Sequence, residues 1–151
     1  MKTFNNITEI LDFAIGEEQA AVDFYLVLAA QSKSAQSKTV FHEFAQEEMR
    51  HKVNLLNIRE TGAFQLSDEK VRDLKIAEYL VDVKPSASMT YQEALILAMK
   101  KEKAAFRMYS NLADKASDPS VKALFLQLAQ EESKHKLRFE IEYDDYILKE
   151  N

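Results

Sequence analysis

The sequence predicts an all-α protein, a four-helix bundle in which one long crossover joins two helix pairs. Long helices are expected because only two glycines and two prolines interrupt 151 residues. Apolar residues also recur at helical spacing in four long segments. The two halves of the chain share one register, in which the matching residues lie 84 positions apart: Glu18 and Glu102, Glu48 and Glu132, His51 and His135, and Tyr25 and Tyr109.

The first helix pair follows from its end signals. Asn6 heads a sequence that resembles a capping box, which predicts a helix over about 7–30. A polar loop over 32–37 is expected next. It leads to a second helix over about 39–60, which Gly62 ends.

The second pair repeats this pattern. Thr90 begins another capping box, and a third helix is expected over about 91–115. Asp118 and Pro119 read as an N-cap followed by proline at the first helical position. The fourth helix therefore starts here and continues towards Leu148.

The linker between the pairs decides the topology. It spans about 61–89 and contains a short helical pattern over 67–83. Such a linker can run the length of a bundle, since a helix of about 22 residues spans roughly 33 Å. We therefore expect one domain over 1–151, with repeats at about 6–60 and 90–149 joined by one long crossover rather than by a tight turn.

Composition excludes several classes of protein. The hydrophobic fraction of 46% and the charged fraction of 30% are typical of a soluble globular protein. A net charge of −5 with no basic run argues against nucleic acid as a partner. No apolar run is long enough for a membrane helix or a signal peptide, so a cytoplasmic protein is expected. The chain has no cysteine, so any metal must be held by oxygen and nitrogen donors.

Four glutamates and two histidines interrupt the apolar stripes. Each helix carries one such glutamate, and two helices add a histidine three residues later, on the same face. The candidate metal ligands are therefore Glu18, Glu48, His51, Glu102, Glu132 and His135.

Energetics favours a metal role for these residues. A buried ion without a partner costs several kcal/mol, and four of them would rival the roughly 5–15 kcal/mol that stabilises a domain. Four carboxylates balance two divalent cations in charge. Carboxylate and imidazole donors suit iron or manganese, with zinc as an alternative occupant. The competing interpretation is a purely structural bundle with solvated charged faces, which the shared 84-residue register disfavours.

Other polar residues have a simpler interpretation. Glu17, Glu47 and Glu131 precede the inward glutamates and lie about 100° around the helix, so they are expected at the surface or rim. His42 is one place off the apolar stripe and is expected to be exposed.

Tyr25 and Tyr109 have two interpretations. Helical side chains lean towards the N-terminus, so each hydroxyl could reach back and bond a ligand carboxylate. Equally, a tyrosine on a bundle stripe can be plain packing with a solvated hydroxyl. The sequence leaves both open.

These motifs resemble the rubrerythrin branch of the ferritin-like superfamily. The resemblance covers nearly the whole chain, helix by helix. It rests on four segments: Ala14-Ile-x-x-Glu18-x-x-Ala21-x-x-Phe-Tyr25, Phe41…Ala45-Gln-Glu-Glu48-x-x-His51, Ala98-Met-x-x-Glu102-x-x-Ala105-x-x-Met-Tyr109 and Phe125…Ala129-Gln-Glu-Glu132-x-x-His135.

The resemblance implies a ferritin-like bundle around a di-iron centre that reacts with hydrogen peroxide or dioxygen. In it Glu48 and Glu132 would bridge the two irons, and one histidine would cap each ion. Glu18 and Glu102 would be terminal ligands or would shift between binding modes on oxidation. The chain departs from rubrerythrins in two ways. It has no cysteine-bound iron domain, so a separate electron donor such as a rubredoxin-type protein is expected. Ala105 also stands where rubrerythrins carry a further carboxylate.

The leading functional hypothesis is therefore a di-iron oxidoreductase, of peroxidase or ferroxidase type, in oxidative-stress defence or iron handling. The six-ligand set is closer to a stand-alone erythrin or ferroxidase-like protein. Two alternatives stay open: an iron-storage protein without dedicated turnover, and a manganese catalase-like enzyme. A homodimer is the largest assembly expected.

Overall fold

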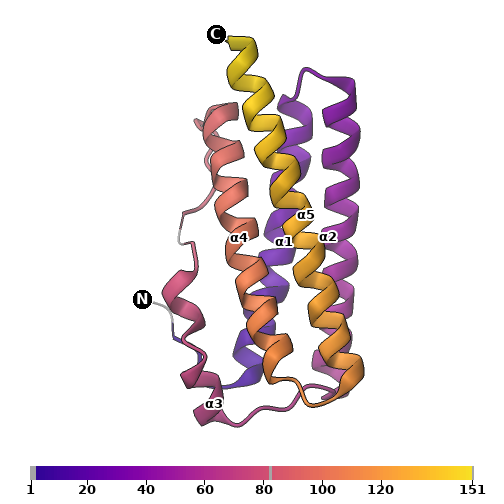
Figure 1. Cartoon of the computed structure of the whole chain (residues 1–151), viewed down its shortest axis with the longest axis vertical. Coiled ribbons are helices and arrows are strands. Elements are labelled where there is room, and N and C mark those ends of the chain that lie inside the picture. Colours follow the sequence, from indigo (N-terminus) through magenta and orange to yellow (C-terminus); the bar gives the residue numbers. More distant parts are fainter. Residues whose placement is uncertain (1–2, 82, 151) are drawn as a thin grey trace.

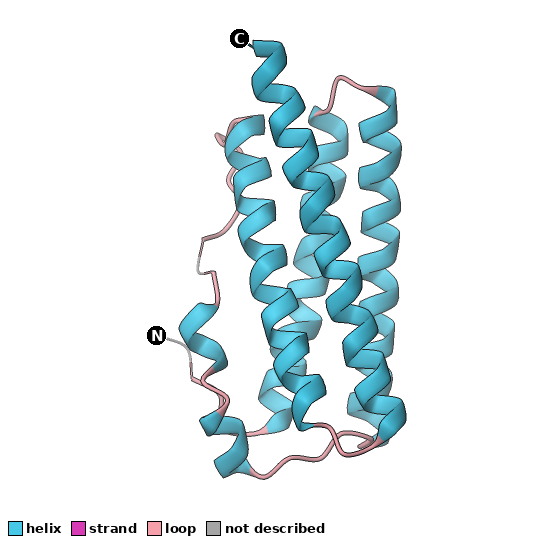
Figure 2. Ribbon diagram, viewed as in Figure 1, coloured by secondary structure: helices cyan, strands magenta, loops and turns pink. Residues whose placement is uncertain are grey.

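Four long helices form the bundle, and the computed structural model describes residues 3–81 and 83–150 (Figure 1). No strand occurs in these ranges, so the all-α fold is confirmed (Figure 2). The elements in chain order are α1 (Ile7–Gln31), α2 (Ala35–Thr61), α3 (Asp68–Asp73), the 3₁₀ helix η1 (Ile76–Tyr79), α4 (Tyr91–Lys115) and α5 (Pro119–Glu150).

The expected end signals act where the sequence places them. The Asn6 side chain accepts a hydrogen bond from the Glu9 amide at the start of α1. A complete capping box opens α4, in which Thr90 and Glu93 each bond the other's backbone amide. At the end of α2, Gly62 adopts the left-handed conformation, with a φ of 66°, and its amide bonds a carbonyl of the preceding turn.

The second long helix begins four residues earlier than the sequence indicated. The Ser34 hydroxyl accepts a hydrogen bond from the Ser37 amide, so Ser34 is the N-cap and α2 starts at Ala35. Serine is common both in loops and at N-caps, so the serine-rich stretch over 32–37 does not by itself show where the helix begins. Only residues 32–34 separate α1 from α2.

The crossover runs beside the bundle from the lower end of α2 to the upper end of α4 (Figure 1). The α1–α2 and α4–α5 pairs are antiparallel hairpins, as in a ferritin-like bundle. The expected crossover helix over 67–83 is shorter and is broken into α3 and η1, because Lys75 takes a positive φ of 51°. Asp82 of that segment lies outside the described residues.

Two apolar cores fill the bundle, and the polar residues lie between them. Each long helix passes from one core to the other at the position of its inward glutamate. The lower core contains Ile10, Leu11, Leu55, Ile58, Leu112, Phe125 and Leu128, among others. The upper core contains Leu28, Phe41, Leu95 and Phe139, among others.

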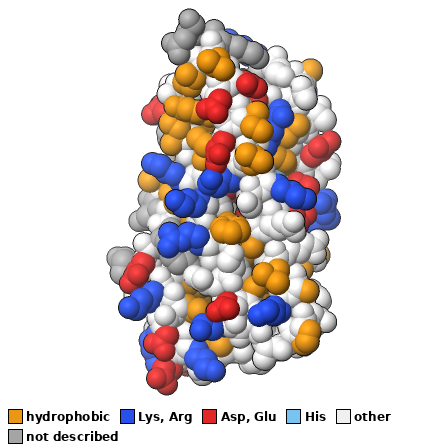
Figure 3. Space-filling model, in the orientation of Figure 1, with side chains coloured by type: hydrophobic (Ala, Val, Ile, Leu, Met, Phe, Trp, Pro, Cys, Tyr) orange, Lys and Arg blue, Asp and Glu red, His pale blue; other side chains and the backbone are white. Residues whose placement is uncertain are grey.

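Figure 3 shows one face of the exterior, on which Lys and Arg side chains, Asp and Glu side chains and hydrophobic side chains are all present. Of the helices in the described residues, none combines the length and apolarity that crossing a membrane requires.

The two glycines give a matched test of the helix ends. Gly62→Ala should destabilise the protein by about 1 kcal/mol, because a Cβ is unfavourable in the left-handed conformation. Gly16→Ala, inside α1 with open space around the added Cβ, should instead stabilise by up to about 1 kcal/mol. Urea unfolding of both variants measures the difference. Equal effects of the two substitutions would contradict this account of the α2 terminus.

Candidate metal centre

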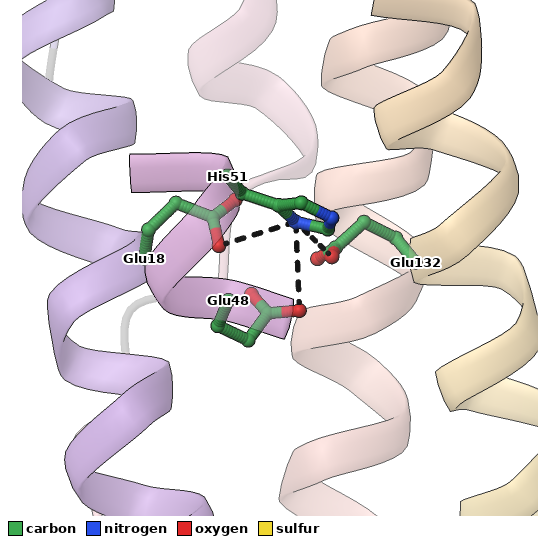
Figure 4. A group of neighbouring side chains, drawn as sticks. All are labelled: Glu18, Glu48, His51 and Glu132. Atoms are coloured by element: carbon green, nitrogen blue, oxygen red, sulfur yellow. Dashed lines mark ion pairs between the residues drawn. The ribbon is translucent and has the colours of Figure 1, made fainter. Parts of the chain in front are cut away.

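The structure brings all six predicted residues together at mid-bundle. Their exposed fractions are only 1–3%. Glu18 comes from α1 and Glu102 from α4, while α2 and α5 each supply a glutamate and a histidine. Figure 4 shows one half of the cluster, in which the His51 ring points towards the carboxylates of Glu18, Glu48 and Glu132.

The six residues form two overlapping groups of four. One group is Glu18, Glu48, His51 and Glu132; the other is Glu48, Glu102, Glu132 and His135. Within each group, one donor atom per residue lies within 4.8 Å of the others. Glu48 and Glu132 belong to both groups, which is the arrangement that two carboxylates shared between two neighbouring ions would need.

Of the seven buried side-chain atoms without hydrogen-bond partners in the described residues, six fit a pair of metal ions; the seventh is Nε of Arg138. Each of the six residues contributes one such atom: Oε2 of Glu18, Oε1 of Glu48, Nδ1 of His51, Oε2 of Glu102, Oε1 of Glu132 and Nδ1 of His135. Unsatisfied buried polar atoms are rare and costly in proteins. Six of them facing one another, all oxygen or imidazole nitrogen, are the donor set that iron or manganese prefers.

Each histidine is held from outside by a glutamate of the opposite hairpin. Nε2 of His51 lies 2.9 Å from Oε2 of Glu131, and Nε2 of His135 lies 2.7 Å from Oε2 of Glu47. Since a carboxylate accepts, each Nε2 carries the proton and Nδ1 faces the centre. Such contacts orient a metal-binding imidazole and make it more basic.

The sequence predicts only a surface or rim position for these outer glutamates, without a partner. Glu47 and Glu131 are partly exposed, at 31% and 22%, which agrees with a rim position. Their bonds to the histidines were missed because each partner lies on another helix. The available signal was the doubled glutamate itself, since both segments read Glu-Glu-x-x-His. Glu17 makes no such bond and pairs with Lys101 instead. His42 is exposed, as expected.

The two tyrosines also bond across the repeats. The Tyr25 hydroxyl donates to Oε1 of Glu102, and the Tyr109 hydroxyl donates to Oε1 of Glu18 at 2.5 Å. Both rings are buried, so these hydroxyls are not solvated. Of the two interpretations that the sequence left open, bonding to a glutamate of the cluster is the one seen. Each tyrosine reaches the glutamate of the other repeat, not that of its own helix.

Burial and mutual repulsion perturb the carboxylates. Burial, reinforced by the charges of Glu132 and Glu18, raises the pKa of Glu48 well above its ordinary value. Burial and the charge of Glu132 raise the pKa of Glu102 to about 8. For Glu132, burial alone would raise the pKa, but its interactions with His51, Glu48 and His135 together outweigh this and lower the pKa to about 2.

The histidines carry the compensating charge when no metal is bound. Burial would lower the pKa of both rings, yet the surrounding carboxylates raise the pKa of His51 to about 11 and that of His135 to about 10. Nδ1 of His51 lies 3.1 Å from Glu132, an ion-pair distance without hydrogen-bond geometry. A metal ion must therefore displace a proton from each Nδ1.

Helical bundles whose facing helices supply carboxylates and Glu-x-x-His pairs to a buried centre are the class of ferritin-like di-metal carboxylate proteins. Comparison with protein families agrees with this class: the family model described as Rubrerythrin matches residues 9–143. The chain belongs to the rubrerythrin family, which confirms the resemblance seen in its motifs. Comparison with curated proteins and with solved structures gave no match. Family and cluster together indicate a di-metal site.

The outer glutamates can be tested by metal affinity. Replacing Glu47 or Glu131 by alanine should weaken binding of Co²⁺ or Fe²⁺ by about 10–100-fold, because the imidazole loses its orienting partner. Competition with a chelator measures the affinity. Glu43→Ala, an exposed change on the same helix as Glu47, should leave it unchanged. Wild-type affinity in both outer variants would refute the orienting role.

The metal-free protein should lose stability in alkali. Because the pKa of His51 and His135 is raised above the ordinary 6.5, their contribution is complete below about pH 6.5 and is lost as pH rises through 10–11. The raised pKa of Glu102 acts in the same direction, through about pH 8. Thermal unfolding in chelator from pH 6 to 10 measures this decline.

A double His51→Gln, His135→Gln variant should show a flatter pH dependence, and His42→Gln should match the wild type because His42 is exposed. Metal loading should also flatten the pH dependence of stability, since the metal ions take the place of the protons on Nδ1 of the two histidines. A metal-free wild type whose stability does not fall between pH 6.5 and 10 would contradict the charge assignment.

Proposed function

We propose that this protein is a di-iron oxidoreductase that reduces hydrogen peroxide or dioxygen, in oxidative-stress defence or iron handling. The proposal depends on one observation: six buried donor atoms have no hydrogen-bond partner, and their residues form two overlapping groups. Membership of the rubrerythrin family supports iron as the metal.

In this proposal the protein holds one iron with Glu18 and His51 and the other with Glu102 and His135. Glu48 and Glu132, which belong to both groups, would bridge the two ions. When bound, two ferrous ions would supply the two electrons that convert one hydrogen peroxide and two protons into two water molecules.

The chain's own residues prepare the site for this reaction. Glu47 and Glu131 keep each imidazole turned so that Nδ1 faces the centre. Tyr25 and Tyr109 fix one oxygen of Glu102 and of Glu18, which leaves the other oxygen of each carboxylate free to bind. The two apolar cores exclude bulk water above and below the site and so strengthen electrostatic interactions within it.

Further parts of the proposal concern partners. The electrons that return the irons to the ferrous state would come from a donor such as a rubredoxin-type protein. We propose a cytoplasmic protein, a homodimer at most, that binds neither nucleic acid nor membrane.

Ferrous loading tests the proposal. Anaerobic protein should bind two ferrous ions per chain, and stopped-flow mixing with peroxide or oxygen should give a ferric absorption band. A Glu48→Ala, Glu132→Ala double variant should lose both properties because it removes the shared carboxylates. Failure to take up iron, or the absence of a ferric band with either oxidant, would refute the proposal. Uptake with oxidation but no repeated turnover would favour iron storage.

A further inference from the structure

A narrow cavity leads from the cluster of six candidate metal ligands towards the crossover side of the bundle. Its volume is about 60 Å³, which is room for a few water molecules. At its inner end it is lined by Glu18, Glu48, Glu102 and Glu132 and by both tyrosines. It therefore reaches the carboxylates directly.

The outer end of this cavity adjoins a larger groove. The groove has a volume of about 660 Å³ and lies between α1, α4 and the crossover segment 84–89. The two spaces lie next to each other, since five residues line both of them: Glu17, Ala20, Phe24, Pro85 and Lys101. The cavity and the groove are together named the path, with the cluster bordering its inner end and the crossover segment its outer end.

Small side chains form much of the narrow part. Ala20 and Ala21 from α1 and Ala105 from α4 line it, so no long side chain fills the space there. Ala105 lines the cavity beside the four glutamates of the cluster, and its methyl group leaves open space there.

An ion pair spans the junction between cavity and groove. Nζ of Lys101 lies 3.6 Å from Oε2 of Glu17, and both residues line the cavity and the groove. The two positions are equivalent in the 84-residue repeat, yet they carry opposite charges. Like charges at these two equivalent positions would repel each other. The opposite charges form an ion pair instead, which joins α1 to α4 at the junction.

We propose that this path is the oxidant's route to the metal cluster, and that the Glu17–Lys101 pair and the three alanines restrict it to hydrogen peroxide and dioxygen. Hydroperoxides with a bulky organic group would be excluded by size. The proposal rests on the proposed oxidoreductase function and adds the residues that determine its specificity.

Blocking the opening provides the first test. Ala20 is exposed and lines both spaces, so the Ala20→Phe side chain should obstruct the passage without entering either core. We expect ferric-band formation with hydrogen peroxide to slow by about tenfold or more. Ala30→Phe places the same side chain at an exposed position of α1 away from the path, and should react as the wild type does. Equal rates in the two variants would overturn the route.

Widening the opening provides the second test. The wild type should react with hydrogen peroxide at least about tenfold faster than with cumene hydroperoxide. Lys101→Ala removes the ion pair and should reduce this ratio, while Lys103→Ala, an exposed change on the same helix, should preserve it. An unchanged ratio in Lys101→Ala would refute the role of the pair. If Ala20→Phe fails to fold, Ala20→Leu replaces it.

Xenon binding separates failure of the route from failure of the function. Crystals of the metal-free wild type under xenon pressure should show an atom in the cavity beside Ala105, and Ala105→Leu should exclude it. A wild type without xenon there would overturn an open path, whatever the chemistry. Xenon in the cavity, combined with no reaction of the iron-loaded protein with any oxidant, would support the path and refute the proposed function.

Discussion

The burial of four carboxylates between two apolar cores is the constraint on which the rest of the structure depends. Each is nearly inaccessible to water, and this burial, reinforced by the charge of Glu132, raises the pKa of Glu48 and Glu102. Two imidazoles and two tyrosine hydroxyls around the carboxylates offset the free-energy cost of burying them. In the proposed function, metal ions do so as well. An apolar residue at any of these positions would pack more easily, so the arrangement is best explained by binding.

The sequence predicted the all-α bundle and the six residues that cluster in it, because both follow from patterns within single helices. A glutamate on an apolar stripe can be recognised within its own helix, and the 84-residue register joins the four helices without knowledge of their packing. The crosswise bonds of Glu47 and Tyr25 depend on which helices face each other, so no spacing along the chain reveals them. The early start of α2 and the break at Lys75 depend on the backbone conformation at single residues. The local sequence there is compatible with more than one conformation, so it does not predict either feature.

The repeat is exact in the cluster and inexact around it. Phe44 stacks on the His135 ring with centroids 4.0 Å apart, while the position equivalent to Phe44 in the second repeat is Leu128, which has no aromatic ring. At the opening, Glu17 is matched by Lys101. The two halves of the centre therefore share donors but differ in their surroundings.

Each group of four donors draws on both hairpins. Glu18, Glu48 and His51 come from the first hairpin and meet Glu132 from the second, and the other group combines the hairpins in the reverse proportion. Neither hairpin alone has a complete group. A metal ion bound here would fasten the two repeats to each other at mid-height, as a disulfide would in a chain that had cysteines. In this bundle the metal centre would also be its cross-link.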